Sequence, residues 1–468
     1  MITGLQIRNF KGWKDTGPIR LAPITVFFGP NSSGKSSIGQ FLMMLRQTAD
    51  SPDRGRVLHP GDKSTPVDLG RFADMLFGHD LTQELSFSLG WQESRPVEFR
   101  DVVSNRKFSG RDLAFEARIS AQGKEAERPV CRDFLYTLKR PDADGKLLDL
   151  LKAGMGPHAE RPEKYDLTCE GFELVRQRGR PYGLPAPLHF FGFPDEASVY
   201  WQNATTLQEF PFTLRKRLNR LFYLGPLRRH PERQYAWAGE TPEQVGFTGE
   251  NWVGALLAAR QRQMNAGKGR RKEGFEALIA RWLKDLGLIH SFKVEPIHGT
   301  RDYRVQVQVS EFSAPVSIPD VGFGVSQILP VLVECFYAPP DSTIIIEQPE
   351  LHLHPAVQQG LADLFVEVIH SREDGKERGI QLVIESHSEH FLRRLQLRVA
   401  DQTVRREDVS AYFCAPGQEA LVLSKLDVDL YGNITNWPKD FFGDQMTDVA
   451  EMQKAGIQRR RAGEGAAT

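Results

Sequence analysis

The chain has 468 residues, enough for about two or three domains, and its 40% hydrophobic and 26% charged residues are ordinary for a soluble globular protein. Because 60 basic residues balance 60 acidic ones, an overall basic field for nucleic acid is excluded, and any such contact must come from a local patch. Four widely spaced cysteines without a CxxC pair, and no apolar run near the roughly 18 residues that cross a membrane, fit a protein of the reducing cytoplasm without membrane contact.

The first motif in the chain is a phosphate-binding loop. Residues 24–28 form an apolar run that predicts a buried strand, and a helical pattern follows the loop. Between them, "GPNSSGKS" fits G-x-x-x-x-G-K-[ST] in the strand–loop–helix context that this motif requires. Its glycines let backbone N–H groups turn towards phosphate oxygens, and the helix N-terminus adds its positive dipole. The expected nucleotide-contacting residues are Gly29, Pro30, Asn31, Ser32, Ser33, Gly34, Lys35, Ser36 and Ser37.

Two side chains of this loop have specific expected roles. Lys35 would reach the β- and γ-phosphates, and the Ser36 hydroxyl would ligate magnesium. A Gly/Ser-rich turn with a chance lysine is the alternative, and the strand and helix on either side argue against it. Upstream, Phe10, Lys11 and Trp13 either flank an adenine base or belong to the core at a strand end.

The region after the loop predicts a β lobe. Residues 83–120 alternate apolar and polar side chains, which predicts an antiparallel sheet beside the nucleotide-binding core. Residues 131–215 are less regular and contain a Pro/Gly-rich stretch, so we expect a short inserted subdomain there. No heptad pattern is sustained over three or four repeats, which excludes a long coiled coil.

Three basic stretches leave alternatives open. Arg228, Arg229 and Arg233 face either phosphates or ion-pair partners. The segment 259–275, which shows no strand pattern, is either a nucleic-acid-contacting loop or a solvated surface loop. The tail beyond residue 450 reads as flexible, with the same alternative of nucleic-acid contact.

A glycine-rich turn precedes the second half of the expected site. In "DVGFGVSQILP", Gly322 and Gly324 allow close backbone approach, and Ser326 is the expected N-cap of a helix with Pro330 in its first turn. Such a turn is a second anion site, although it has no lysine.

Downstream, "TIIIE" predicts a buried strand that ends in a metal-side carboxylate, Glu347. A second buried strand is expected at residues 380–384, with His387 just beyond it. The stretch "IEQPE" places Gln348 and Glu350 next in the chain. Because an amide cannot take a proton from water at neutral pH, Gln348 can orient a water but cannot be a general base, and Glu350 is the alternative base.

The same segments contain a second pattern of possible metal ligands, since histidines with carboxylates bind transition metals. This alternative predicts a metal-dependent nuclease centre. Its candidate ligands are Glu350, His352, His354, Glu385, His387 and His390.

Together the motifs resemble the head of ABC-type ATPases, in the branch of SMC-like and OLD-like (overcoming-lysogenisation-defect) ATPases. The resemblance rests on "ITGLQIRNFKGW", "GPNSSGKSS", "GFGVSQILP", "IEQPELHLHP" and "ESHSEHFL". Two further stretches, "FYLGPLRRHPERQYAWAG" and "YGNITNWPKDFFGD", resemble a narrower bacterial family of stand-alone AAA-annotated ATPases with an uncharacterised C-terminal domain. The resemblance covers residues 1 to about 90 and 215 to about 450.

This resemblance implies an α/β fold with bound ATP and Mg²⁺. Glu347 would take the metal-side role and His387 the γ-phosphate-sensing role. The turn of Gly322, Gly324 and Ser326 would close on the nucleotide of a partner in a head-to-head homodimer or higher homo-oligomer. The chain departs from the wider pattern because the turn lacks the usual Ser-Gly-Gly run, Gln348 stands at the usual catalytic glutamate, and no acidic TOPRIM-type nuclease cluster follows residue 390.

The expected architecture is therefore an ABC-type P-loop head with an antiparallel β lobe. Its parts are residues 1–130 and 216–450 as the two halves of the head, 131–215 as an inserted subdomain, and 451–468 as a flexible tail. The expected function is a slow ATP hydrolase that acts as a nucleotide-gated dimeric switch on an effector protein encoded nearby, in bacterial antiviral defence or a DNA-related process. The alternatives are an ATP-binding scaffold with negligible turnover and a DNA-repair-type nuclease subunit.

Overall fold

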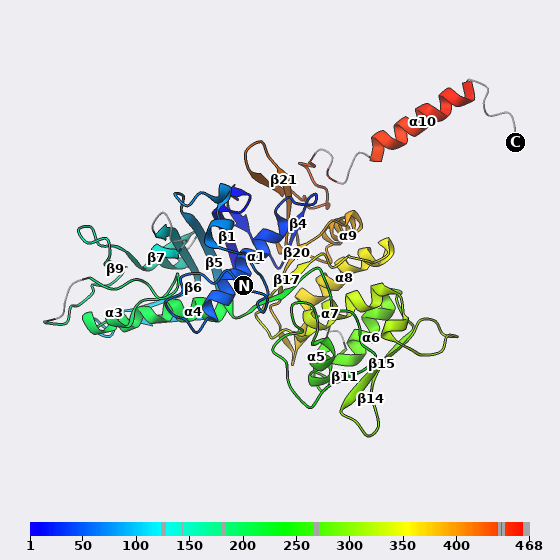
Figure 1. The fold of residues 1–468 in the computed structure, drawn as a ribbon, viewed down its shortest axis with the longest axis horizontal. Coiled ribbons are helices and arrows are strands. Elements are labelled where there is room, and N and C mark those ends of the chain that lie inside the picture. The colour runs from blue at the N-terminus through cyan, green and yellow to red at the C-terminus, as the bar shows by residue number, and fades with distance from the viewer. Residues whose placement is uncertain are drawn as a thin grey trace.

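The computed structural model describes residues 1–122, 128–142, 144–179, 183–265, 267, 271–438, 441 and 445–461. Within these ranges the chain builds a large antiparallel sheet and a six-stranded, mainly parallel sheet, and most helices lie around the second one (Figure 1). The mixed α/β class predicted from the sequence is confirmed. Over the same ranges, every helix is too short or too polar to span a bilayer.

The large sheet contains the predicted antiparallel lobe and extends beyond it. Its strands are β1 (Ile2–Phe10), β2 (Trp13–Asp15), β3 (Ile19–Arg20), β5 (Leu85–Arg100), β6 (Lys107–Gln122), β7 (Arg128–Pro141), β8 (Leu147–Pro157) and β9 (Tyr165–Glu170). Along the first halves of β5 and β6, buried and more exposed side chains alternate, as the sequence pattern predicted. The sheet runs in the order β2-β1-β5-β6-β7-β8-β9, so the boundary that we expected at residue 130 falls inside one continuous sheet.

The parallel sheet carries the two predicted halves of the head. In spatial order its strands are β10 (Leu221–Leu224), β17 (Thr343–Glu347), β20 (Gln381–Glu385), β4 (Ile24–Phe28), β21 (Val409–Pro416) and β22 (Leu421–Leu426). Every neighbouring pair is parallel except β21 and β22. All residues of β4, β17 and β20 are buried, as expected for strands that are covered on both faces.

Two hydrophobic cores meet at this sheet. Phe27 of β4 belongs to the core shared with the large sheet, whereas Val26 and Phe28 belong to the core on the opposite face. The first core contains apolar residues of α1, and the second contains those of α7, α8 and α9. These helices are α1 (Lys35–Ala49), α7 (Phe323–Tyr337), α8 (Pro355–His370) and α9 (Glu389–Ala400).

Shorter elements complete the fold. The remaining helices are α2 (Phe72–Met75), η1 (Phe77–His79), α3 (Asp195–Tyr200), η2 (Ala204–Gln208), α4 (Glu209–Leu218), α5 (Trp252–Ala258), α6 (Phe275–Asp285), η3 (Ile318–Asp320), η4 (Arg406–Asp408) and α10 (Gln445–Arg461). Two small sheets contain β11 (Tyr235–Ala236), β14 (Ser291–Pro296), β15 (Asp302–Gln308) and β16 (Val316–Ser317), and β12 (Gln263–Asn265), β13 (Glu273–Gly274), β18 (Arg372–Glu373) and β19 (Lys376–Glu377).

Helix α7 begins earlier than the sequence predicted. Its N-cap is Gly322, and Ser326 lies within its first turn, where the hydroxyl donates a 2.7 Å hydrogen bond to the carbonyl oxygen of Phe323. Ser326 therefore does not cap the helix, since its hydroxyl is bonded inside the turn. Pro330 lies in the helix interior, where it cannot donate a hydrogen bond to the carbonyl four residues earlier.

Two other segments differ from expectation. Strands β12 and β13 form in the basic segment 259–275, for which we predicted no strand, because β12 pairs with both β13 and the distant β18. Helix α10 covers part of the expected flexible tail and stands apart from the rest of the molecule (Figure 1). Its sequence is rich in Gln, Arg, Ala and Met, which favour helices locally.

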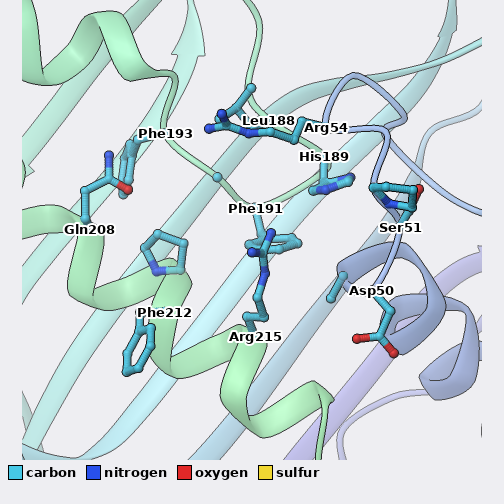
Figure 2. A pocket seen from close by; sticks show the side chains of 14 residues that line it. Asp50, Ser51, Arg54, Leu188, His189, Phe191, Phe193, Gln208, Phe212 and Arg215 are labelled. Carbon is cyan, nitrogen blue, oxygen red and sulfur yellow. The ribbon is translucent and has the colours of Figure 1, made fainter.

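A cavity of about 460 Å³ opens at the C-terminal end of α1 (Figure 2). Asp50, His189, Phe191 and Arg215 are among its lining residues. Because α1 has 15 residues, it separates the two ends by roughly 20 Å at 1.5 Å per residue. The cavity and the glycine-rich loop are thus different places in the fold.

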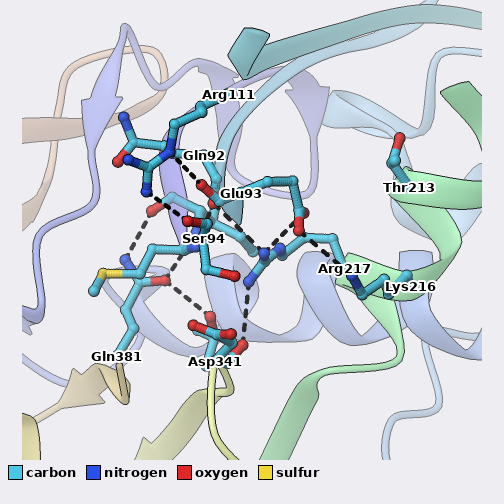
Figure 3. A network of polar contacts seen from close by, with 12 residues as sticks. Gln92, Glu93, Ser94, Arg111, Thr213, Lys216, Arg217, Asp341 and Gln381 are labelled. Atoms are coloured by element: carbon cyan, nitrogen blue, oxygen red, sulfur yellow. Dashed lines mark hydrogen bonds and ion pairs between the residues drawn. The ribbon is translucent and has the colours of Figure 1, made fainter. Parts of the chain in front are cut away.

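A buried polar network joins the large sheet to the parallel sheet (Figure 3). Arg217 of α4 forms a 2.8 Å ion pair with Glu93 of β5, and these two side chains are only 3% and 6% exposed. The Arg217 guanidinium also donates to the carbonyl oxygen of Asp341, two residues before β17. On the same seam, the Gln381 amide donates to Ile2 O and accepts from Ile2 N and Thr343 Oγ1. The network therefore bonds the N-terminal strand to both halves of the fold.

We expect Arg217→Met to destabilise the protein strongly, because it leaves the Glu93 carboxylate buried without its main cation. Loss of one partner of a buried pair lowers the free energy of unfolding by roughly 3–5 kcal/mol. Arg217→Met combined with Glu93→Met should lose less than the sum of the two single changes in urea denaturation. Arg54→Met, which removes an exposed ion pair with Asp195, is the control and should change stability by less than about 1 kcal/mol. Additive losses at Arg217 and Glu93 would contradict the coupling.

Candidate active site

The Gly29–Ser37 loop leaves β4 and enters α1 through backbone conformations that favour glycine. Gly29 has φ 143° and Gly34 has φ 82°. A Cβ atom at Gly29 would lie 2.1 Å from the carbonyl oxygen of Cys414, and one at Gly34 would lie 2.3 Å from a methyl carbon of Leu421. Both glycines are therefore required by the path of the loop, independently of any ligand.

Lys35 lies in the mouth of this loop. Its ammonium donates to the carbonyl oxygens of Gly29 at 3.1 Å and Pro30 at 2.7 Å. The side chain is 3% exposed, and its Nζ lies 4.0 Å from Oε1 of Glu385. Burial lowers the pKa of Lys35, while Glu385 and other nearby acidic groups oppose that shift.

The neighbouring serines have different environments. Asn31 and Ser32 are exposed and Ser36 is half-buried. The Ser33 hydroxyl is buried without a hydrogen-bond partner in the described structure. Ser37, by contrast, accepts from Trp13 Nε1 at 2.7 Å and donates to Gly34 O at 2.5 Å, so its hydroxyl supports the loop.

Two carboxylates stand together at the ends of the neighbouring strands. Glu347 of β17 is in register with Glu385 of β20, and Glu385 is in register with Phe27 of β4, two residues before Gly29. The Tyr223 hydroxyl donates a 2.9 Å hydrogen bond to Glu347 Oε1. Burial, reinforced by the Glu385 charge, raises the pKa of Glu347 to about 7. The register thus concentrates negative charge beside the loop that holds Lys35.

These groups fit a hydrated Mg²⁺ ion, which prefers carboxylate and hydroxyl oxygens. The Oε2 atom of Glu385 is buried and has no hydrogen-bond partner in the described structure, which is costly for a polar atom, while the Lys35 ammonium lies 4.0 Å from the other carboxylate oxygen. Glu347, Glu385 and the Ser36 hydroxyl are the oxygen donors that would hold the ion.

Gln348, Glu350 and His387 follow the two carboxylates in the chain and contact one another. The Gln348 backbone has φ 45°, and its amide Nε2 lies 3.3 Å from His387 Nε2. Glu350 Oε1 accepts a 2.5 Å hydrogen bond from the His387 backbone N–H, while its Oε2 is buried without a partner in the described residues. Burial and the Lys35 charge lower the pKa of His387, so the imidazole is neutral near pH 7. Three of the predicted site residues are therefore brought into one contact group.

The glycine-rich turn lies on an exposed surface next to this group. Gly322 and Phe323 are exposed, and a Cβ at Gly324 would lie 3.3 Å from the carbonyl oxygen of His352. The Phe323 ring makes edge-on contacts with His352 at 5.1 Å and His230 at 5.5 Å between centroids. The turn therefore packs on the segment that follows β17. Ser326 is 7% exposed and its hydroxyl is bonded within α7, so the hydroxyl does not face a neighbouring subunit.

The described residues do not bring the alternative metal ligands together. Among them, no cluster of three or more His, Cys, Asp or Glu side chains has a metal-binding arrangement. His354 instead caps α8 by accepting from the Ala356 N–H, and His390 is exposed on α9. His352 contacts Phe323 as described above.

Most basic and aromatic candidates have structural partners. Arg229 pairs with Glu232 and Arg233 with Asp320, and within the basic segment Arg260 pairs with Glu276 and Arg262 with Glu373. Phe10 and Trp13 are fully buried in the core, which excludes adenine stacking for both. The Lys11 ammonium donates to Gln40 at 2.6 Å.

Sequence reasoning missed the place of two residues in the site and did not single out a third. Glu385 was named only as a ligand of the alternative metal centre, although "QLVIE" ends in a carboxylate in the same way as "TIIIE". Tyr223 carried no signal because its role depends on the parallel pairing of β10 with β17. Arg228 was grouped with two other arginines, but it alone of the three is buried, and its Nη2 donates to the carbonyl oxygen of Glu347 at 3.2 Å.

The solved structures that are similar to this chain include three SMC heads, all at low sequence identity. The SMC head domain from Thermotoga maritima has a TM-score of 0.38 and 10% identity, covering 91% of this chain and 99% of that chain. An SmcHead bound to the C-winged helix domain of ScpA has a TM-score of 0.38 and 10% identity, covering 91% and 98%. An Smc head domain with an extended coiled coil, bound to the C-terminal domain of ScpA and derived from Pyrococcus furiosus, has a TM-score of 0.36 and 11% identity, covering 97% and 99%.

Two family models match residues in the second half of the chain. No curated protein matches the chain. Residues 209–393 match the family described as "AAA domain, putative AbiEii toxin, Type IV TA system", and residues 404–452 match "Protein of unknown function (DUF3696)". The first match contains Glu347 and Glu385, and the Gly29–Ser37 loop joins them through the parallel sheet. The chain thus carries a P-loop ATPase domain of this AAA family followed by the DUF3696 domain.

Proposed function

We propose that the protein binds ATP with Mg²⁺ and hydrolyses it slowly, as a switch. The observation that carries this proposal is the convergence of Lys35 with the paired carboxylates Glu347 and Glu385 at one edge of the parallel sheet. Backbone N–H groups of the Gly29–Ser37 loop and the N-terminus of α1 would hold the triphosphate. When bound, the magnesium ion would neutralise phosphate charge.

Slow turnover follows from the group beside the expected γ-phosphate position. Gln348 can orient a water through its amide but cannot accept a proton from it. Glu350 retains one unbonded carboxylate oxygen, yet its other oxygen is committed to the His387 backbone. Lys35 and the loop can stabilise charge in the transition state without a strong base. Turnover should therefore be slow but measurable.

Dimerisation is the second part of the proposal. The Gly322 turn is exposed next to the loop that follows β17, where a second subunit could approach. A γ-phosphate held between the Gly29 loop of one subunit and the Gly322 turn of another would close such a dimer only with ATP. Because the Ser326 hydroxyl is bonded within α7, backbone N–H groups at Gly322 and Gly324 would make the contact.

A role in bacterial defence or a DNA-related process, through an effector encoded nearby, is the wider context that we propose. The family description names a putative toxin of a type IV toxin–antitoxin system, which favours a cell-regulating function over metabolism. A nucleotide-binding scaffold with negligible turnover is the second candidate, favoured by Gln348 at the position of the base. Arg271 and Lys272 are exposed and are the candidate residues for contact with nucleic acid; Arg270 lies outside the described residues.

Lys35→Ala should weaken ATP binding about 10- to 150-fold, because one charge-assisted contact is worth roughly 1.5–3 kcal/mol. Isothermal titration calorimetry with Mg-ATP measures this change. Lys14→Ala is the matched control, since Lys14 is exposed and its side chain lies outside the loop. If the Lys35→Ala variant binds Mg-ATP as tightly as the wild type, the proposed ATP site at the Gly29–Ser37 loop is wrong.

Gln348→Glu should raise kcat for ATP at least tenfold, since general-base assistance is worth roughly 10²–10⁴-fold and the new carboxylate would lie beside His387. Phosphate release under saturating Mg-ATP provides the measurement. Gln359→Glu adds the same charge at an exposed position of α8 and should leave kcat unchanged. Glu350→Gln should lower the residual wild-type turnover. Fast wild-type hydrolysis that survives Glu350→Gln would contradict the slow-switch proposal.

A further inference from the structure

Arg228 occupies an unusual position beside the proposed nucleotide site. It follows β10, whose residue Leu224 is in register with Ile346 of β17, so the chain leaving β10 passes the end of β17. Its guanidinium is anchored by one hydrogen bond from Nη2 to the carbonyl oxygen of Glu347, at 3.2 Å. The residue is 8% exposed.

The rest of this guanidinium has no partner in the described structure. Its Nε and Nη1 atoms are buried without a hydrogen bond. A buried charge is normally paired and fully hydrogen-bonded, because leaving it unpaired costs free energy. Arg229 and Arg233, in the same stretch of chain, are exposed and paired with carboxylates. Arg228 therefore has buried donors without a partner, whereas the side chains of Arg229 and Arg233 are exposed to water and ion-paired.

The chemistry of the missing partner follows from the donor geometry. Guanidinium N–H groups match the oxygens of phosphate, which they bind as a planar fork. Arg228 lies at the same carboxyl-terminal edge of the sheet as the Gly29–Ser37 loop, but on the β17 side, whereas Lys35 lies on the β4 side. A phosphate chain that runs from the loop towards Glu347 would meet a cation at each end.

We infer that Arg228 is a second phosphate-binding cation, supplied in cis, that contacts the terminal phosphate of ATP. This inference rests on the proposed ATP site and adds to it a residue that distinguishes ATP from ADP. The anchor on Glu347 O fixes the guanidinium to the strand that carries the metal-side carboxylate. Loss of the γ-phosphate would leave the fork unpaired, so the protein should bind ADP without any contribution from Arg228.

The test compares ATP and ADP affinities by calorimetry in the full chain. Arg228→Gln removes the charge and should weaken ATP at least tenfold while ADP affinity changes less than twofold. Arg228→Lys keeps the charge but loses the fork, and should lie between wild type and Arg228→Gln. Arg229→Gln is the matched control and should change neither affinity. A purely structural role would instead lower both affinities equally.

Two outcomes separate this inference from the proposed function. If Lys35→Ala weakens ATP binding as predicted but Arg228→Gln keeps the wild-type ratio of ATP to ADP affinity, the site stands and the role of Arg228 is overturned. If Lys35→Ala leaves ATP binding intact, the proposed site itself fails. Should Arg228→Gln not fold, the ratio of ATP to ADP affinity is measured in Arg228→Lys instead, where it should fall below the wild-type ratio. An unchanged ratio in Arg228→Lys would then overturn the inference.

Discussion

The parallel pairing of β17, β20 and β4 is the constraint on which the candidate site depends. It sets Glu347 opposite Glu385 and Glu385 opposite Phe27, and it therefore places two carboxylates beside the start of the Gly29–Ser37 loop. The three strands are buried along their whole length, so a slip of one residue would turn every side chain into the wrong core. The two cores on opposite faces of the sheet thus fix the geometry at its edge.

The same sheet explains how distant parts of the chain make one site. The loop comes from the N-terminal segment, and the carboxylates come from segments more than half the chain away. Gln381 bonds to Ile2 and Thr343, and Arg217 bonds to Glu93 and Asp341, so polar contacts tie the large sheet to the base of β17 and β20. These contacts lie at the opposite strand ends from Glu347 and Glu385. The polar contacts that hold the two sheets together therefore lie at one end of these strands, and the candidate site lies at the other end.

The sequence predicted those parts of the fold whose signals are local. The strand–loop–helix around Lys35 and the alternation in β5 and β6 are local patterns, and the structure contains them. Strands β7–β9 pair with their neighbours in the chain, but the sequence did not predict them. Their alternation of buried and exposed side chains is interrupted, as at the register shift between Leu138 and Lys139. The start of α7 was misplaced because Ser326 has the chemistry of a cap but bonds within the helix. Tyr223 and Arg228 reach Glu347 only through the pairing of β10 with β17, which no local pattern reveals.

Nucleotide-dependent association is the most direct test of the switch, because a γ-phosphate shared by two subunits links binding to dimer closure. Light scattering on the full chain, with Mg-ATP, with Mg-ADP and without nucleotide, reports the molar mass in each state. We predict that the mass doubles with ATP and stays that of a monomer in the other two conditions, and that Lys35→Ala stays monomeric throughout. The same mass in all three conditions would contradict the account.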